Sequence, residues 1–372
     1  MDFPGSFEVD KVRNKRFEVL QTLEIPTADQ IYKETFRAQY TGYKKIKGVN
    51  PTSKTETYFR IIEIDNPIIR TILKTFYSAY RFFIRLSHIF DVKKFNLVII
   101  EHQIFPYLPA FPEYLVKRLN KNMVIEFDDA IYLTFLHRKK MEKNLRNVTG
   151  AIVGNKYLAE FARKFNNEVK VIPTVIDTDR YKGKESYKAE RITISWVGLS
   201  YNLSYLFSLK EVFNILSEKF NISLKIISSK NLIIEGVDII FKKWSYEDEV
   251  KDLRSADIGI MPLPDNEWTK GKCGAKLLQY MACGLPTVSS PVGVNSEIIK
   301  DGENGFLAEN NEEWIKKLTL LIEDKNLREK MGEKARKTVE EKYSLEKWAD
   351  ELVNTYCHFN SLNKISTFWP QG

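Results

Sequence analysis

Two lysines four residues apart, Lys272 and Lys276, mark the start of an amphipathic run within "TKGKCGAKLLQYMACGLPTVSSPVGVNSEII", residues 269–299. Their spacing places both ammonium groups on one face of a helix, in its first turn or just before it. Cations at a helix N-terminus oppose the macrodipole, which costs about 0.3–1 kcal/mol for each exposed charge. A negatively charged ligand at this turn would offset that cost. The spacing therefore predicts an anion-binding site.

The two lysines stand between a strand and a helix. The segment "ADIGIMPLPDNEW" is typical of a buried strand that runs into a polar loop, and "AKLLQYMACG" is typical of the helix that follows. The backbone N–H groups of Cys273, Gly274 and Ala275 then point into a cleft, where they and the lysines form a phosphate or pyrophosphate site. Gly274 lets the backbone approach the ligand closely. The alternative, in which the lysines are ordinary surface residues, leaves this arrangement unexplained.

Composition favours a large, reduced, water-soluble protein. A chain of 372 residues exceeds what one core usually supports, and 43% hydrophobic residues are ample for packed cores. The three cysteines form no metal or disulfide pattern, which indicates a reducing compartment. No apolar run reaches the length of about 18 residues needed to span a bilayer, and the N-terminus lacks a signal-peptide core. We expect a cytoplasmic protein that does not cross the membrane.

The net charge of +8 is shared unevenly. Residues 1–190 carry 33 Lys and Arg against 23 Asp and Glu, whereas the remaining residues carry 24 against 26. A basic first half suggests an anionic partner such as lipid headgroups or nucleic acid. A solvated lysine-rich surface explains the same numbers, so both interpretations stay open.

Strand-like and helix-like segments alternate along the chain, which predicts α/β layers on parallel sheets. The expected strands of the first half are 58–64, 96–100, 123–127, 150–154 and 169–172. The expected strands of the second half are 191–198, 222–228, 237–244, 256–263 and 285–290, with helices near 202–219, 246–254, 273–282 and 312–342. Residues 173–190 show no sustained period and are the expected linker.

The fold class that follows is α/β, with two doubly wound Rossmann-like domains that face each other across a cleft. We expect an acceptor-side domain over residues 1–175 and a nucleotide-sugar-binding domain over 176–344. The helix of 345–372 is expected to pack back on the first domain. Sheets of this kind bind ligands beyond the carboxyl ends of their strands.

Several stretches resemble one known family. "KLLQYMACGLPTVSSPVGVNSEII", followed by "DGENGFLA", resembles the donor-binding signature of retaining glycosyltransferases of the GT-B fold, group 1 or family 4. The similar branch carries "GK…KLL-x-YMA-x-G-x-P". Three further stretches agree in the family's order: "VIEFDDAIY", "AIVGNKYLAEFA…VIPTVID" and "ISWVGLSYNLSYL". The likeness covers about residues 96–345.

The resemblance implies a nucleotide-sugar donor, no metal, and transfer with retention to a glycan or lipid-linked acceptor in cell-surface polysaccharide or glycoconjugate synthesis. It places the donor diphosphate at the turn of 272–277, the sugar against Gly271–Gly274, and the ribose near Gln279. The donor-binding residues it implies are Gly198, Trp244, Gly271, Lys272, Cys273, Gly274, Ala275, Lys276, Leu277, Gln279 and Glu297. Trp244 then shapes or stacks on the base, or is a plain core residue. Glu297 contacts the donor or caps a helix.

The chain departs from the family pattern at two places. Many relatives carry two glutamates eight residues apart, where this chain has Gly271 and Gln279. An amide can still hydrogen-bond a ribose hydroxyl, but the missing first carboxylate leaves the sugar's identity open. Relatives also place an Arg and a Lys on the diphosphate, and "GLSYNLSYL" has neither. We expect Lys272 and Lys276 to replace them.

Three residues are candidates for catalysis. Asp128 and Asp129 end a buried strand, where carboxylates need partners. One can orient the acceptor or balance the positive sugar ring while the other caps the next segment, or both can be caps. His102, just past strand 96–100, is either in the cleft or structural.

The helix of 67–90 bears on the acceptor, because aromatic residues alternate there with Arg70, Lys74, Arg81 and Arg85. Such a helix lies in an anionic membrane interface, or it packs on the sheet while its arginines reach water.

Two other classes of function stay open beside a glycosyltransferase. A nucleotide-sugar epimerase shares the two-domain cleft but needs no acceptor. A non-catalytic nucleotide-sugar-binding or nucleic-acid-binding protein would explain the missing glutamate and the basic first half, and steeply salt-dependent RNA binding would favour it. Of the macromolecular partners, nucleic acid is the less favoured.

Overall fold

A computed structural model gives the fold and describes residues 61, 64, 66–105, 108–134, 137–187 and 190–365. Its first sheet is parallel throughout, with strands in the order β1-β2-β3-β4. The strands are β1 (Val98–Glu101), β2 (Met123–Phe127), β3 (Gly150–Val153) and β4 (Val169–Val171). Of the strand expected at 58–64, the described residues are Ile61, which is helical, and Ile64, so the expectation is wrong at Ile61. The rest lies outside the described residues.

Both faces of the first sheet are buried, as the apolar runs of its strands require. On one face, residues such as Met123, Ile125 and Phe127 pack against helices. These helices are α5 (Pro67–Asp91), α6 (Phe111–Leu119), α7 (Arg138–Asn147) and α8 (Lys156–Arg163), with a 3-10 turn η2 (Val92–Lys94) after α5. On the other face, Val124 and Ile152 pack against α17 (Leu345–Ile365).

The second sheet has six parallel strands in the order β10-β9-β8-β5-β6-β7. They are β5 (Ile192–Val197), β6 (Ile222–Ser228), β7 (Ile239–Lys243), β8 (Ile258–Met261), β9 (Thr287–Ser289) and β10 (Phe306–Leu307). The chain leaves β5 for β6 and β7 on one side and returns to β8 on the other side. The carboxyl ends of β5 and β8 therefore form a switch point, where sheets of this kind bind ligands.

Helices cover both faces of the second sheet. One face packs against α9 (Leu203–Phe207), α10 (Lys210–Lys219) and α15 (Asn311–Glu323). The other packs against α11 (Glu249–Arg254), α13 (Ala275–Ala282), α14 (Asn295–Ile298) and α16 (Lys325–Lys342). The single helix expected at 312–342 is wrong, because the chain breaks at Asp324 (φ −105°, ψ 101°). There the carboxylate accepts from the Leu327 N–H and starts α16 as an N-cap.

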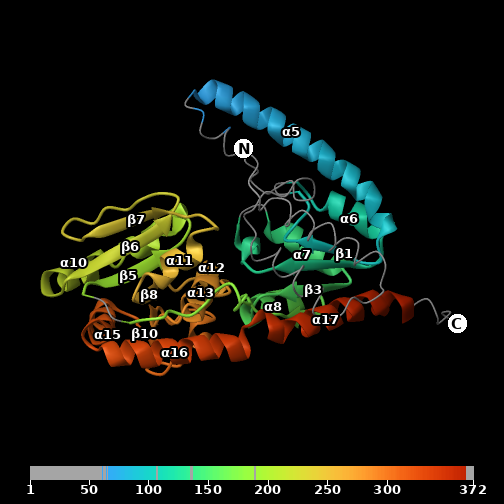
Figure 1. The fold of residues 1–372 in the computed structure, drawn as a ribbon. Helices are drawn as coiled ribbons and strands as arrows, with labels where there is room; N and C mark the ends of the chain where they lie inside the picture. The colour runs from blue at the N-terminus through green and yellow to red at the C-terminus, as the bar shows by residue number, and fades with distance from the viewer. Residues whose placement is uncertain are drawn as a thin grey trace.

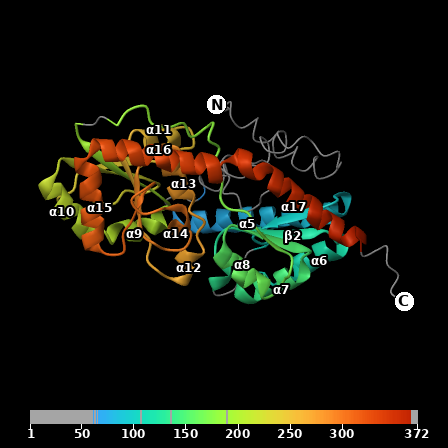
Figure 2. The ribbon, with the colours of Figure 1, turned by 90° about the horizontal axis from the view of Figure 1, so that it is seen from below.

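Residues 172–191 connect the two sheets, and α16 and α17 join the domains a second time. Figures 1 and 2 show α16 beside the second sheet and α17 continuing along the first, on the side away from α5. The last turns of α17 press Phe359 onto Gly150, whose hypothetical Cβ would lie 2.1 Å from the ring. The C-terminal helix is thus part of the first domain's core.

We expect Phe359→Ala to lower the free energy of unfolding by about 3–5 kcal/mol, because this side chain is fully buried and its loss leaves a cavity. Urea unfolding followed by tryptophan fluorescence measures the change. The matched control is the neighbouring His358→Ala, which removes a partly exposed contact to Glu168 (3.0 Å) worth about 0–1 kcal/mol. Equal losses in the two variants would show that α17 does not stabilise the first sheet.

Candidate functional site

The turn that starts α13 lies beyond β8, at the switch point of the second sheet. Its path is set by α12 (Glu267–Lys270), which Asn266 begins with a capping box. Gly274 follows with a left-handed φ of 72°, and a Cβ there would lie 2.7 Å from Ile298 Cδ1. No described side chain caps the first turn of α13. The first N–H groups of this helix therefore remain available to an anion.

The two lysines at this turn point to different partners. Lys272 precedes the helix, and its Nζ lies 3.7 Å from Asp129 Oδ1 in the first domain and 5.6 Å from the Trp268 ring centroid. Lys276 lies within the helix, and its Nζ contacts the side-chain oxygen of Gln279 at 3.0 Å. The prediction that they share one helical face is wrong, because the left-handed residue between them interrupts the helical geometry.

The same turn is docked against the first domain by hydrogen bonds and close packing. The Asn155 amide, at the start of α8, donates to the carbonyls of Gly271 (3.0 Å) and Lys272 (3.1 Å). Cys273 turns its thiol to the Asp128 carbonyl (3.1 Å). A Cβ on Gly271 would lie 2.6 Å from Ala130 Cβ. A glutamate therefore does not fit at 271 in this arrangement of the domains.

The thiol of Cys273 has a structural role here. It packs with the core of the first domain, and burial raises its pKa well above the usual value. A thiol that stays protonated is a poor nucleophile or ligand. Cys273 therefore contributes packing and its backbone to the site.

His102 and Asp128 form a pair on the first domain's edge of the site. His102 follows β1 with φ 60°, an uncommon backbone for a residue other than glycine, and its Nε2 lies 3.1 Å from Asp128 Oδ1. Desolvation opposes the charge on both groups, but their mutual hydrogen bond and attraction outweigh it. The pKa of His102 is raised and that of Asp128 is lowered. The pair is thus charged over a wider pH range than either group alone.

Asp129 behaves differently from its neighbour. Desolvation and the charge of Asp128 raise its pKa, although Lys272 acts in the opposite direction. The short helix that follows, η3 (Ile131–Leu133), has no side-chain cap among the described residues, so neither acid caps it. Two adjacent carboxylates with pKa values shifted in opposite directions suit different roles in proton transfer and charge stabilisation.

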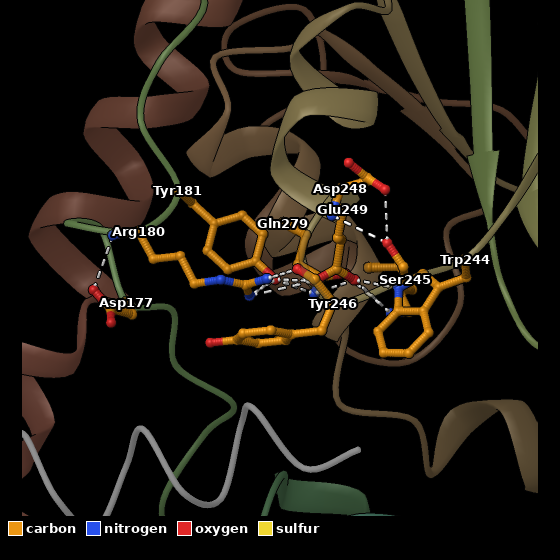
Figure 3. Close-up of polar contacts among 10 residues, drawn as sticks. Asp177, Arg180, Tyr181, Trp244, Ser245, Tyr246, Asp248, Glu249 and Gln279 are labelled. Atoms are coloured by element: carbon orange, nitrogen blue, oxygen red, sulfur yellow. Dashed lines mark hydrogen bonds and ion pairs between the residues drawn. The ribbon is translucent and has the colours of Figure 1, made fainter. Parts of the chain in front are cut away.

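Gln279 and Trp244 meet at a buried carboxylate, that of Glu249 at the start of α11 (Figure 3). The Oε1 atom accepts from Trp244 Nε1 (2.9 Å) and Gln279 Nε2 (3.3 Å), and it lies 3.8 Å from Lys276 Nζ. The Gln279 amide nitrogen therefore faces inward. The Trp244 indole likewise has its N–H engaged by the protein.

The other carboxylate oxygen, Oε2, binds the connection between the domains. It accepts from the Tyr181 hydroxyl (2.6 Å) and lies 3.3 Å from Arg180 Nη1. The Arg180 guanidinium also lies 3.8 Å from the Tyr246 ring centroid and donates to the Tyr246 carbonyl. Sequence reasoning missed Glu249, Arg180 and Tyr181, because Tyr181 lies 68 residues from Glu249 and 98 residues from Gln279 along the chain.

The remaining predicted residues, Glu297, Gly198, Leu277 and Ala275, lie in four different kinds of place. Glu297 forms a partly exposed ion pair across the domains with Lys156 (2.7 Å). Gly198 directly follows β5, and a Cβ there would lie 2.5 Å from the Trp196 ring. Leu277 is fully buried in the core. Ala275 is the first residue of α13.

Family models match two parts of the chain. "Glycosyl transferases group 1" matches residues 218–338. "Glucose-6-phosphate dehydrogenase, C-terminal domain" matches residues 1–146, where the described part includes β1 and β2 of the parallel sheet.

Two curated relatives each match about a third of the chain. The chain is 31% identical over 129 residues to N-acetyl-alpha-D-glucosaminyl L-malate synthase of Bacillus anthracis, and the match covers 34% of this chain and 32% of that protein. It is 32% identical over 116 residues to an uncharacterised glycosyltransferase of Methanocaldococcus jannaschii, covering 31% and 29%. The chain thus spans about a third of the length of these curated relatives.

Solved structures share the two-domain fold. A glycosyltransferase from Rickettsia africae superposes with a TM-score of 0.60 at 15% identity, covering 95% of this chain and 94% of that chain. Anabaena HepE, solved with UDP and glucose, gives 0.57 at 13% identity and covers 74% and 81%. A point mutant of S. aureus TarM, solved with fondaparinux, alpha-GlcNAc-glycerol and UDP, gives 0.54 at 17% and covers 66% and 53%.

The fold and the matches together define the class of protein. Two parallel-sheet domains in this arrangement form the GT-B fold. Residues 218–338 match the glycosyl transferases group 1 domain, which confirms the group 1 part of the resemblance found in the sequence.

The Asn155 contact offers a test of how the domains are held together. Asn155→Asp keeps the oxygen that caps α8 but loses the N–H donors to the Gly271 and Lys272 carbonyls. We expect a loss of about 1–3 kcal/mol in stability and a larger radius of gyration by X-ray scattering.

Asn310→Asp is the control for this prediction, because Asn310 caps α15 in the same way without touching the other domain. Matching scattering curves and stabilities for the two variants would refute a docking role for Asn155.

Proposed function

We propose that this protein is a glycosyltransferase that moves a sugar from a nucleotide-sugar donor to a glycan or lipid-linked acceptor with retention. Its place is the synthesis of a cell-surface polysaccharide or glycoconjugate. The observation that carries the proposal is the uncapped start of α13, with Lys272 beside it, at the switch point and against the first domain. The group 1 match and the UDP in the TarM and HepE structures support it.

The chemistry makes one main demand on the site. Glycosyl transfer passes through an oxocarbenium-like state while negative charge develops on the departing diphosphate, so fixed donors and cations at that charge lower the barrier. In this proposal the first N–H groups of α13 and Lys272 stabilise the diphosphate, and no metal takes part. Asp128, kept ionised by His102, faces them from the first domain and balances the positive sugar ring.

Epimerisation of the donor is the competing activity. It would use the same diphosphate site but needs no acceptor, so the side of the site near His102 and Asp128 would have no role in binding one. Product analysis separates the two, because an epimerase converts the nucleotide sugar without acceptor. Binding of nucleotide sugar with no turnover would instead indicate the non-catalytic alternative.

Lys272→Ala tests the diphosphate site. A charge-assisted contact to a desolvated phosphate contributes about 1.5–3 kcal/mol, so UDP affinity should fall roughly 10- to 150-fold. Uridine affinity should change far less, because uridine has no phosphate. Calorimetric titration with both ligands measures this.

Lys270→Ala is the matched control for that titration. Its ammonium group is more exposed and pairs with Asp265 at 2.9 Å, so both affinities should remain unchanged. If Lys272→Ala weakens UDP and uridine equally, this lysine supports the fold and does not bind the phosphate.

Helix α5 suggests where the protein binds its acceptor. Its exposed apolar residues recur at spacings of three, four and seven, which places them on one face. They include Ile69, Ile72, Phe76, Tyr80 and Phe83. Among the described elements, α5 packs mainly against α6, which lies beside its C-terminal end in Figure 1, and against η2.

In the sequence of α5, Arg70, Lys74, Arg81 and Arg85 are spaced by four, seven and four residues, a helical spacing that differs from that of the apolar residues. An apolar face beside a basic one is typical of a helix that lies in an anionic bilayer surface. No helix in the described part of the chain is long and apolar enough to cross a bilayer. The apolar and basic spacings of α5 support a peripheral position at the cytoplasmic face of a membrane, which we include in the proposal.

Phe76→Ser with Phe83→Ser tests this position, since each exposed ring contributes about 1.5–3 kcal/mol when it enters an apolar phase. We expect sedimentation with phosphatidylglycerol vesicles to fall at least ten-fold while UDP binding stays intact. Arg81→Glu with Arg85→Glu should reduce it as well.

Thr71→Ala with Thr75→Ala, exposed positions outside the apolar face, should leave sedimentation unchanged. A wild-type protein that ignores anionic vesicles would rule the membrane role out.

A further inference from the structure

We propose that Glu249 is a positioning residue for the donor, and this rests on the proposed function. It holds Lys276 charged and turned toward Gln279, on the ribose side of the site. It thereby supplies the carboxylate that position 279 lacks. In this view, the carboxylate that many relatives carry at the position of Gln279 in α13 is supplied in this chain by Glu249 at the start of α11.

The carboxylate of Glu249 is built into the structure and is not a surface charge. Its side chain is 3% exposed, and the described residues give both of its oxygens hydrogen-bond partners. Lys276 lowers its pKa together with hydrogen bonds from Tyr181 and Trp244, and these outweigh the opposing effect of burial. Glu249 is therefore ionised at neutral pH.

Lys276 depends on this carboxylate for its charge. Burial lowers the pKa of Lys276, the charge of Arg180 lowers it further, and Glu249 acts in the opposite direction. The charged groups that act on its ammonium are Glu249 from α11 and Arg180 from the connection, and the neutral Gln279 of its own helix accepts its hydrogen bond. Without the charge of Glu249, Lys276 loses its proton at a lower pH.

The glutamine at 279 follows from the same geometry. Its Nε2 donates to Glu249 Oε1 (3.3 Å) and to the Tyr181 hydroxyl (2.7 Å), while its Oε1 accepts from Lys276 (3.0 Å). A glutamate there would place a second carboxylate oxygen against Glu249, and the like charge would raise the pKa of one of the two carboxyl groups. One carboxylate and one amide satisfy all the donors.

The cluster also reaches the connection between the domains. Tyr181 donates its hydroxyl proton to Glu249 and accepts from Gln279, and Arg180 donates to the Tyr181 hydroxyl (2.9 Å). Figure 3 shows these side chains converging on Glu249 from the connection, from the loop after β7 and from α13. The position of Lys276 is thus set by three separate segments.

A charge swap between positions 249 and 279 tests the inference. Calorimetry measures UDP affinity from pH 7.5 to 9.5, above the second ionisation of the phosphate near pH 6. In Glu249→Gln, we expect UDP affinity to fall between pH 7.5 and pH 9.5 by a factor about 10-fold larger than in wild type. The reason is that Lys276, with its pKa lowered further, loses its charge as the pH rises. Gln279→Glu should bind UDP weakly throughout, because it places two acids side by side.

The double variant Glu249→Gln, Gln279→Glu should bind better than either single variant and recover the wild-type pH profile, because one carboxylate again faces Lys276. Thermal unfolding of all four proteins shows that each is folded. A double variant that binds no better than the single variants, or a Glu249→Gln profile that follows wild type, overturns the inference alone. Wild type that fails to bind UDP overturns the proposed function and this inference with it.

Discussion

The site depends on one constraint, the close packing of the two domains at two glycines. Gly154 of the first domain packs against Cys273, and Gly271 of the second domain packs against Ala130. A Cβ on Gly154 would lie 2.3 Å from the sulfur of Cys273, and one on Gly271 would lie 2.6 Å from Ala130 Cβ. Neither position accepts a side chain while the domains are docked. The start of α13 consequently lies directly against the acids that end β2, and the Asn155 amide fixes the two in register.

The two lysines have different tasks because their carboxylate partners differ in exposure. Asp129 is 41% exposed and lies 3.7 Å from Lys272, so this contact is weak and a phosphate can compete for the lysine. Glu249 is 3% exposed, and a buried carboxylate loses much more if its cation leaves. Under the proposed function, Lys272 can therefore follow the charge of the leaving diphosphate, whereas Lys276 orients the group beside Gln279.

The sequence was sufficient to predict the features that arise locally. Apolar runs bounded by glycine and polar residues located the strands, and the glycine before "AKLLQYMACG" located the uncapped helix start. It was insufficient where distant segments meet. Glu249 is bound by residues from the connection and from α13, and no local pattern marks such partners. The prediction that the two lysines share one helical face was wrong because it extended helical spacing across Gly274, whose left-handed backbone interrupts the helical geometry.

In the first domain, the fold maintains an unfavourable backbone conformation at His102, on the edge of the site that faces the start of α13. His102 has a left-handed backbone that costs about 1–3 kcal/mol in a residue other than glycine. The loop that follows it is held by Glu113, whose carboxylate accepts from the Ile104 N–H (3.0 Å) and pairs with buried Lys140 at 3.0 Å. Lys140 in turn donates to the Phe105 carbonyl. A buried ion pair is a poor way to gain stability, but removing either partner is costly, so it fixes the loop firmly. The strain at His102 is thereby maintained, and its ring stays against Asp128 and opposite the start of α13.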